Sequence, residues 1–229
     1  MPDSFHTDSA PSGVDAALAS RLARGVHALG LDLSADQQAR LLIYLNELQR
    51  WDRVYNLTAI RDLGEMVTRH LLDSLTVMPY LYDGARILDV GTGAGLPGLV
   101  LAVANPQHHF TLLDSNGKKT RFLHHVYPML GLTNVAVVHS RVETYQPDQP
   151  FEVVLCRAFA SLGDIVALTA PQLASQGRIL AMKGGLDPQE LATVPAGWQV
   201  HVHRLDVPDL DAQRHLLELT PPATKAKKT

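Results

Sequence analysis

From Gly84 onward, short apolar runs alternate with stretches that have the apolar periodicity of helices. The runs are continuous rather than alternating apolar and polar, which is typical of strands buried on both faces of a parallel sheet. They are RILDV (86–90), FTLLD (110–114), VAVVH (135–139), EVVLC (152–156), RILAMK (178–183), WQVHVHRL (198–205) and HLLELT (215–220). Helices are expected near 97–104, 117–131, 161–174 and 187–193. This order predicts a doubly wound, seven-stranded, Rossmann-like α/β fold, closed by an antiparallel pair because no helix separates the last two runs.

The segment before these strands has helical periodicity throughout. Apolar residues recur at steps of three and four from Val14 to Leu31, and Ser34-x-x-Gln37 is a capping-box pattern that opens a second helix. A third helix is expected after Asp62-x-x-Glu65. We therefore predict an N-terminal helical cap over 14–83 and a sheet domain over 84–220. The polar residues 1–13 are expected to form a disordered leader and 221–229 a flexible basic tail.

Composition excludes several classes of protein. Cys156 is the single cysteine in 229 residues, which excludes a disulfide framework and a cysteine-rich zinc site and suits a reducing cytoplasm. No stretch resembles an export signal or a membrane span, so we expect a cytoplasmic protein with no membrane partner. The formal net charge of −3 neither supports nor excludes a nucleic-acid partner, because a local basic face can coexist with an acidic remainder.

A glycine-rich loop follows the first apolar run directly. It reads DVGTGAGLPG (89–98), with glycines at 91, 93 and 95 that let the backbone turn sharply and approach a ligand. In a doubly wound sheet this loop lies at the carboxyl end of the first strand, where ligands bind. Asp114 ends the second run, where its carboxylate can accept hydrogen bonds from both hydroxyls of a ribose.

Two classes of cofactor share these features, since GAGLPG (93–98) also satisfies the dinucleotide pattern G-x-G-x-x-G. Pro97 removes an N–H at the helix start, where a pyrophosphate would bind, and Asp89 would repel a diphosphate. The same Asp89 would suit the ammonium and sulfonium of S-adenosylmethionine. The loop therefore favours S-adenosylmethionine over a dinucleotide. A purely structural glycine turn beside a solvated Asp89 is the alternative.

Motifs outside the loop extend this interpretation. They are WDRVYNLTAI (51–60), RHLLDSL (69–75), DVGTGAGLPG (89–98), LLDSNGKKTRFL (112–123), SRVE (140–143) and RAFASL (157–162). In this order, from about Leu31 to Thr220, the chain resembles the GidB/RsmG family of bacterial methyltransferases. The resemblance implies a class I methyltransferase fold and methylation of N7 of a guanine in 16S ribosomal RNA. The implied partner is that RNA, in the small ribosomal subunit or in an assembly intermediate. The protein is expected to act as a monomer.

The resemblance also implies cofactor contacts. Carried over by position, they fall on Gly91, Leu96, Val142, Glu143 and Arg157. Reasoning from the residues themselves adds Gly93, Gly95 and Asp114. Cys156 departs from the family, which more often has a small polar residue before the arginine.

The implied reaction needs no catalytic base, because guanine N7 carries a lone pair and no proton. We therefore name no catalytic residue. Methylation of an exocyclic amine would need an Asp/Asn-Pro-Pro-aromatic turn after the fourth strand, where this chain has Cys156-Arg157-Ala158-Phe159. The 11 histidines lack supporting ligand spacing, so no metal site is expected.

Two basic groups are candidates for RNA contact, although each is also compatible with an ordinary solvated face. The first follows the second strand and comprises Lys118, Lys119, Arg121, His124 and His125; the second, in the cap, comprises Arg50, Arg53, Arg61, Arg69 and His70. Phe159 could stack on a flipped guanine or pack in the core. Two other functions remain open: a methyltransferase for a small molecule, and a module that binds the cofactor or RNA without turnover.

Methylation of cytosine at C5, an alternative reaction, supplies a first test. A cytosine C5 methyltransferase needs a cysteine nucleophile, and Cys156 ends the fourth run, although a lone strand cysteine is most often a small core residue. We expect Cys156→Ser to retain methyl transfer, measured as incorporation of labelled methyl groups. Complete loss of transfer by a folded variant would restore the nucleophile hypothesis.

Overall fold

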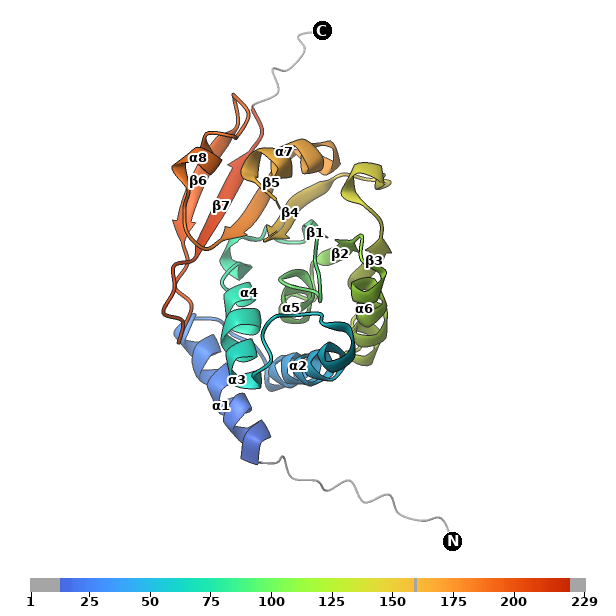
Figure 1. The fold of residues 1–229 in the computed structure, drawn as a ribbon, viewed down its shortest axis with the longest axis vertical. Helices are drawn as coiled ribbons and strands as arrows, with labels where there is room; N and C mark the ends of the chain where they lie inside the picture. The colour runs from blue at the N-terminus through green and yellow to red at the C-terminus, as the bar shows by residue number, and fades with distance from the viewer. Residues whose placement is uncertain (1–12, 159, 223–229) are drawn as a thin grey trace.

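A seven-stranded mixed sheet forms the centre of the computed structural model, which describes residues 13–158 and 160–222 (Figure 1). Its strands are β1 (Arg86–Val90), β2 (His109–Asp114), β3 (Val135–His139), β4 (Phe151–Arg157), β5 (Leu173–Lys183), β6 (Gln199–Arg204) and β7 (His215–Thr220). The order is β3-β2-β1-β4-β5-β7-β6. Strands β1 to β5 pair in parallel, and β7 pairs antiparallel with both β5 and β6. This is the predicted sheet, including its antiparallel closure.

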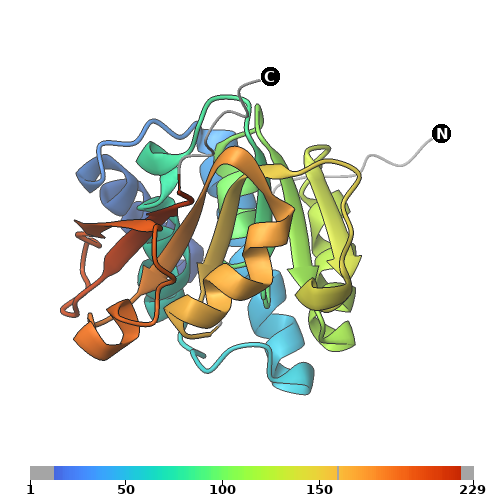
Figure 2. The same cartoon turned by 90° about the horizontal axis from the view of Figure 1, so that it is seen from above.

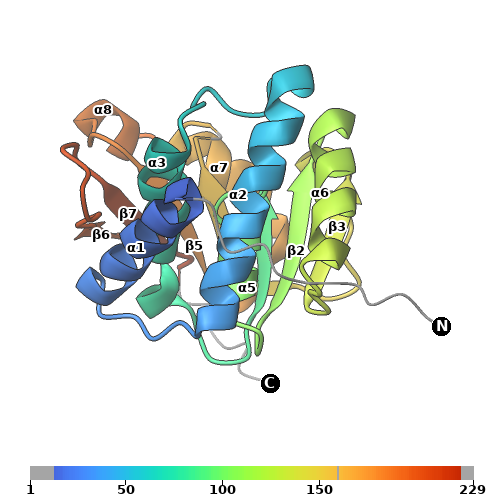
Figure 3. The ribbon, with the colours of Figure 1, turned by 90° about the horizontal axis from the view of Figure 1, so that it is seen from below.

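Helices cover both faces of the sheet. The cap helices, α5 (Gly98–Ala104) and α6 (Gly117–Met129) lie on one face, and α7 (Leu162–Thr169) lies on the other (Figures 2 and 3). Each layer has its own hydrophobic core. The cap and the adjoining face share one continuous cluster, which includes Leu22 and Leu45 from the cap and Leu99 and Phe122 from α5 and α6.

The first two cap helices are α1 (Gly13–Ala28) and α2 (Ala35–Tyr55). The predicted capping box is present, because the Gln37 N–H donates to Ser34 Oγ and the Ser34 N–H donates to Gln37 Oε1. Gln37 Nε2 also donates to the carbonyls of Val103 and Ala104, at 3.1 and 3.0 Å. One capping residue therefore also ties the cap to the end of α5.

The third predicted helix contains a π-helical turn that its sequence pattern did not indicate. Asp62 caps α3 (Leu63–Met66), which continues through a π-helical turn (Val67–Leu72) into α4 (Asp73–Leu75). A π-turn inserts an extra residue and shifts the buried face of a helix. Four polar side chains in this turn and in α4 directly after it are buried, namely Thr68, His70, Asp73 and Ser74.

Several boundaries differ from the sequence-based expectation. The helix expected over 161–174 ends as α-helix at Thr169, and a 3₁₀ turn (Ala170–Gln172) leads into β5 at Leu173 rather than at residue 178. Pro171 has no N–H with which to continue the α-helix. A second 3₁₀ turn (Met78–Tyr80) precedes β1, and the last helix is α8 (Pro188–Leu191).

Gly13 of the predicted leader starts α1, and the rest of that leader lies outside the described residues, as do 223–229 of the predicted tail and Phe159. The expected states of those segments and the expected role of Phe159 are therefore not addressed by the structure. The division into a cap and a sheet domain stays a prediction.

Candidate functional site

The glycine loop connects β1 to α5 at the carboxyl edge of the sheet, where the strand order reverses between β2 and β4. Ligands of doubly wound sheets bind at such a reversal. Gly95 has φ +100°, and a Cβ there would lie 2.7 Å from Leu99 Cβ. A Cβ on Gly98 would lie 2.6 Å from Asp89 Oδ2. Both positions therefore require glycine.

Asp89 occupies the space that the missing Cβ of Gly98 leaves. Its carboxylate is fully buried, and Oδ2 accepts hydrogen bonds from Thr92 Oγ1 at 2.6 Å and the Gly98 N–H at 2.8 Å. Within the described residues, Oδ1 has no hydrogen-bond partner. Burial raises the pKa of this carboxyl to about 6. The alternative of a solvated Asp89 is therefore wrong.

The start of α5 is poorly suited to an anionic ligand. Pro97 precedes α5, and the first N–H of that helix, from Gly98, is already bound by the Asp89 carboxylate. A diphosphate at this helix start would meet a buried carboxylate in place of free N–H groups. The local geometry disfavours a dinucleotide for this reason.

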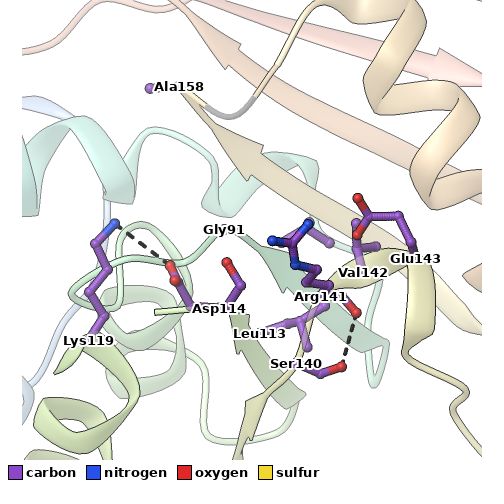
Figure 4. A pocket seen from close by; sticks show the side chains of 11 residues that line it. Gly91, Leu113, Asp114, Lys119, Ser140, Arg141, Val142, Glu143 and Ala158 are labelled. Atoms are coloured by element: carbon purple, nitrogen blue, oxygen red, sulfur yellow. Dashed lines mark hydrogen bonds and ion pairs between the residues drawn. The ribbon is translucent and has the colours of Figure 1, made fainter. Parts of the chain in front are cut away.

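A first pocket of about 400 Å³ opens beside the loop (Figure 4). Four of the predicted cofactor residues line it together: Gly91, Asp114, Val142 and Glu143. The remaining lining residues are Val90, Leu113, Ser115, Lys119, Ser140, Arg141 and Ala158. Sequence reasoning assigned Lys119 to RNA and did not single out Ser140 or Arg141, although both belong to the SRVE motif.

Asp114 is held in a fixed orientation at the end of β2. Its Oδ2 accepts a hydrogen bond from the Gly93 N–H and its Oδ1 from the Asn116 N–H, both at 2.8 Å. Lys119 Nζ lies 3.8 Å from Oδ2 (Figure 4). A carboxylate oxygen has more than one acceptor site, so Asp114 can still accept hydrogen bonds from a ligand.

Val142 and Glu143 form part of a 3₁₀ turn (Val142–Thr144) after β3. Gln172 Nε2 donates to the carbonyls of Val142 and Tyr145, which fixes this turn to the 3₁₀ turn that precedes β5. The Val142 side chain is buried and Glu143 is exposed. The turn therefore offers an apolar surface beside a polar one.

The other predicted cofactor residues have different positions. Gly93 supplies the N–H that holds Asp114, and Leu96 and Gly95 pack under the loop. Arg157, at the end of β4, lines a second pocket. Its Nη1 lies 3.3 Å from Asp73 Oδ2 and donates to the Arg69 carbonyl.

The second pocket encloses about 420 Å³ and adjoins the first, because Ala158 lines both. Ala158 has φ +49°, a left-handed conformation that is uncommon for alanine. The lining residues are Thr58, Ala59, Ile60, Arg69, His70, Asp73, Arg157, Ala158, Met182, Lys183, Gly184 and Arg214. The cap and the sheet both contribute walls to this pocket.

Comparison with known proteins identifies the family. The sequence model described as GidB, rRNA small subunit methyltransferase G, matches residues 37–217. Proteins named ribosomal RNA small subunit methyltransferase G are similar along nearly their whole length. One from Pseudomonas aeruginosa is 51% identical over 88% of this chain and 94% of its own. One from Marinobacter nauticus is 50% identical over 86% of this chain and 92% of its own.

The chain belongs to the rRNA small subunit methyltransferase G family. The predicted family and its enzyme class are confirmed.

Solved structures show the same fold at low identity. A TehB-like SAM-dependent methyltransferase from Corynebacterium glutamicum matches with a TM-score of 0.53 and 16% identity, over 78% of this chain and 98% of that one. A precorrin-6y C5,15-methyltransferase from Geobacter metallireducens matches with a TM-score of 0.52 and 15% identity, over 73% and 92%. The predicted class I methyltransferase fold is confirmed.

The candidate RNA residues of this family member lie in several places. Lys118 and Arg121 are exposed on α6. The same helix contributes Lys119 to the first pocket. Glu47 of α2 pairs with both Arg50 and His125. Arg69 and His70 line the second pocket, and His124 is exposed on α6. Arg53 near the end of α2 and Arg61 in the loop that follows it line a smaller, separate pocket. The two groups therefore meet at Glu47, through Arg50 and His125, while Lys119 lines the first pocket and Arg69 and His70 line the second.

Cys156 lies in the core between the sheet and α7, and burial raises the pKa of its thiol to about 12. It lines neither pocket. Among the described residues, no group of three or more His, Cys, Asp or Glu side chains is placed to hold a metal ion. Nor does the described part of the chain contain a helix long and apolar enough to span a membrane.

The buried Asp89 predicts an unusual dependence of stability on pH. Its pKa of about 6 in the folded state exceeds its ordinary value of 3.8, so the folded protein binds this proton more tightly than the unfolded chain. The free energy of unfolding should therefore fall as pH rises from about 4 to about 6, by about 2–3 kcal/mol from this group. Asp89→Asn should remove that fall and raise stability near neutral pH.

Urea denaturation at several pH values measures this effect. The difference between the wild type and Asp89→Asn isolates Asp89, because the other groups titrate in both proteins. Asp36→Asn is the matched control, since the Asp36 side chain is 68% exposed and pairs only at the surface with Arg40. An unchanged difference in stability across this pH range would contradict the assignment.

Proposed function

We propose that this protein transfers a methyl group from S-adenosylmethionine to N7 of a specific guanine in the 16S rRNA of the small ribosomal subunit. The observation that carries the proposal is the similarity, at 50–51% identity along nearly the whole length of both chains, to proteins named for methylation of small-subunit ribosomal RNA. The geometry of the first pocket supports the choice of methyl donor. The cytoplasm, where ribosomal subunits occur, is the proposed location, and a monomer is the proposed form.

The residues of the first pocket fit S-adenosylmethionine. Asp114 presents only acceptors, which suits the two hydroxyls of a ribose. Val142 and Leu113 supply apolar surface for an adenine, and Glu143 lies at its polar edge. Buried Asp89, with Oδ1 unpaired within the described part of the chain, places negative charge under the loop. That charge suits a cationic ligand and opposes a diphosphate.

The proposed chemistry requires little of the protein beyond positioning. When bound, S-adenosylmethionine supplies a methyl group on a positively charged sulfur, and the guanine N7 lone pair takes this methyl as the carbon–sulfur bond breaks and its electron pair stays on sulfur. Guanine N7 has no proton to lose, so no side chain needs to act as a base. Correct alignment of reactants can contribute about 7–11 kcal/mol. The fixed orientations of Asp114 and Arg157 are of the kind that alignment requires.

Labelled methyl transfer tests the proposed function. Small subunits from a strain that lacks this gene would be incubated with the protein and labelled S-adenosylmethionine, and the modified nucleotide would be mapped. We expect one guanine of 16S rRNA to become methylated at N7. Methylation of small molecules without RNA, or cofactor binding without turnover, would overturn the proposal in favour of the two alternative functions.

Charge reversal on α6 tests whether its basic residues contact RNA. Lys119 lines the first pocket, so its substitution would disturb the proposed cofactor site. Lys118→Glu/Arg121→Glu changes only the two exposed side chains beside it. If both side chains contact phosphates, this variant should bind subunits more weakly. The negative slope of log affinity against log salt concentration should become shallower by about 2. Its affinity for S-adenosylmethionine should not change.

Arg24→Glu/Arg204→Glu is the matched control for this charge reversal. Both arginines are exposed, and they lie on α1 and β6, on the opposite side of the molecule from α6 (Figure 1). Filter binding over a range of salt concentrations measures all three proteins. Equal slopes for the wild type and the α6 variant would exclude phosphate contacts at Lys118 and Arg121.

A further inference from the structure

The second pocket contains a buried carboxylate that methyl-donor binding does not require. Asp73 of α4 is 3% exposed. Its Oδ2 lies 3.3 Å from Arg157 Nη1, and its Oδ1 accepts a hydrogen bond from Arg214 Nε at 3.0 Å. The three residues come from the cap, the end of β4 and the segment before β7. Asp73 therefore holds two arginines from distant parts of the chain in one fixed arrangement.

Local backbone geometry marks the same pocket. Arg69 and His70 line it from the π-helical turn, and Ala158 lines it in a left-handed conformation. Both features cost conformational energy and persist mainly where function requires them. His70 is also 5% exposed, and its Nδ1 has no hydrogen-bond partner among the described residues.

The walls of the pocket suit a planar base. Ile60 and Met182 supply apolar surface, while His70 and Thr58 present polar atoms and are joined by a 2.9 Å hydrogen bond. Burial and the nearby Arg157 lower the pKa of His70 to about 4, so its ring is neutral at physiological pH. The pocket adjoins the first pocket at Ala158, where a base would meet the methyl donor. A base reaches such a pocket only when it is turned out of its stack.

Most of the charged side chains that line the second pocket are cationic. They oppose a reaction in which the base itself becomes cationic. The cations that line it are Arg69, Arg157, Lys183 and Arg214, and Asp73 is the one carboxylate among the described lining residues. When N7 takes the methyl group, no proton leaves, so the purine acquires the positive charge that the sulfur loses. Glu190 already pairs with Lys183 at 2.6 Å, so a cationic purine would lie near Arg69, Arg157 and Arg214, and Asp73 is the lining carboxylate that can offset its charge.

We propose that the second pocket receives the target guanine, and that Asp73 is a positioning residue for methyl transfer. It orients Arg157 and Arg214 toward the base and offsets the positive charge that the base acquires. This inference rests on the proposed function, since it takes guanine N7 as the acceptor. Because the charge appears only as the reaction proceeds, Asp73 should favour the transition state over the bound neutral base.

Single-turnover kinetics on small subunits tests this role. Asp73→Asn keeps the size of the side chain and removes its charge, and we expect a rate at saturating subunit about 10- to 100-fold below wild type. The KM for subunits should change much less. Asp73→Glu restores the charge and should recover part of the rate. Asp36→Asn, which removes an exposed carboxylate elsewhere in the cap, should match the wild type.

Nucleotide binding separates this role from a merely structural one. Guanosine monophosphate and 7-methylguanosine monophosphate would be titrated into the protein saturated with S-adenosylhomocysteine, at a pH that keeps the methylated base cationic. Loss of a structural contact would weaken both nucleotides equally. We expect Asp73→Asn to weaken the methylated nucleotide more, by about tenfold relative to the unmethylated one. If Asp73→Asn does not fold, the ratio is measured with Asp73→Glu, whose displaced charge should also weaken the methylated nucleotide more than the unmethylated one, by less than tenfold.

The outcomes distinguish this inference from the proposed function. If the wild type methylates no guanine N7 in small subunits, the proposed function fails. If it does, but Asp73→Asn matches Asp36→Asn in single-turnover rate, only the role of Asp73 fails. An unchanged ratio of the two nucleotide affinities also overturns that role. Absence of binding of either nucleotide to the wild type at millimolar concentration overturns the assignment of the base to this pocket.

Discussion

The hydrogen bonds of the buried Asp89 carboxylate organise the edge of the sheet on which both pockets depend. Asp89 belongs to β1, Thr92 to the glycine loop and Gly98 to the first turn of α5, so one carboxylate joins a strand, a loop and a helix. The bond to Gly98 forms because glycine leaves room for it. Burial of this charge opposes stability near neutral pH, as its raised pKa shows. The fold therefore retains a costly group at its candidate ligand loop, as functional sites commonly do.

The cap extends this edge into an enclosed site. Gln37 of α2 binds the carbonyls at the end of α5, and the Tyr44 hydroxyl donates to the Ala94 carbonyl within the glycine loop, at 2.9 Å. Asp73 of α4 binds Arg157 at the end of β4 and Arg214 in the segment before β7. Through these contacts the cap supplies one wall of the second pocket and a support for the loop behind the first. Displacement of the cap would disturb both pockets together.

Strong local patterns explain which parts of the fold were predictable. Continuous apolar runs predicted β1, β3 and β7 at their observed bounds, although β3 is a half-buried edge strand and β7 pairs antiparallel with its neighbours. The π-turn was not predicted, because one additional residue in a helix changes its period too little to be read from a short apolar pattern. The first part of β5 was missed for a similar reason. Leu173–Gly177 is mostly polar or half-buried and pairs irregularly with β4.

The sequence by itself determined the strand–helix alternation, the glycine loop and the acidic residue after the second strand. Each of these is a property of consecutive residues, and together with the flanking motifs they indicated the family. Only the tertiary structure decided that Asp89 supports the loop from below, that Lys119 belongs to the first pocket, and that Asp73, Arg157 and Arg214 meet. Such contacts join residues far apart in the chain, and their geometry depends on how the cap packs against the sheet. Local periodicity contains no information about that packing.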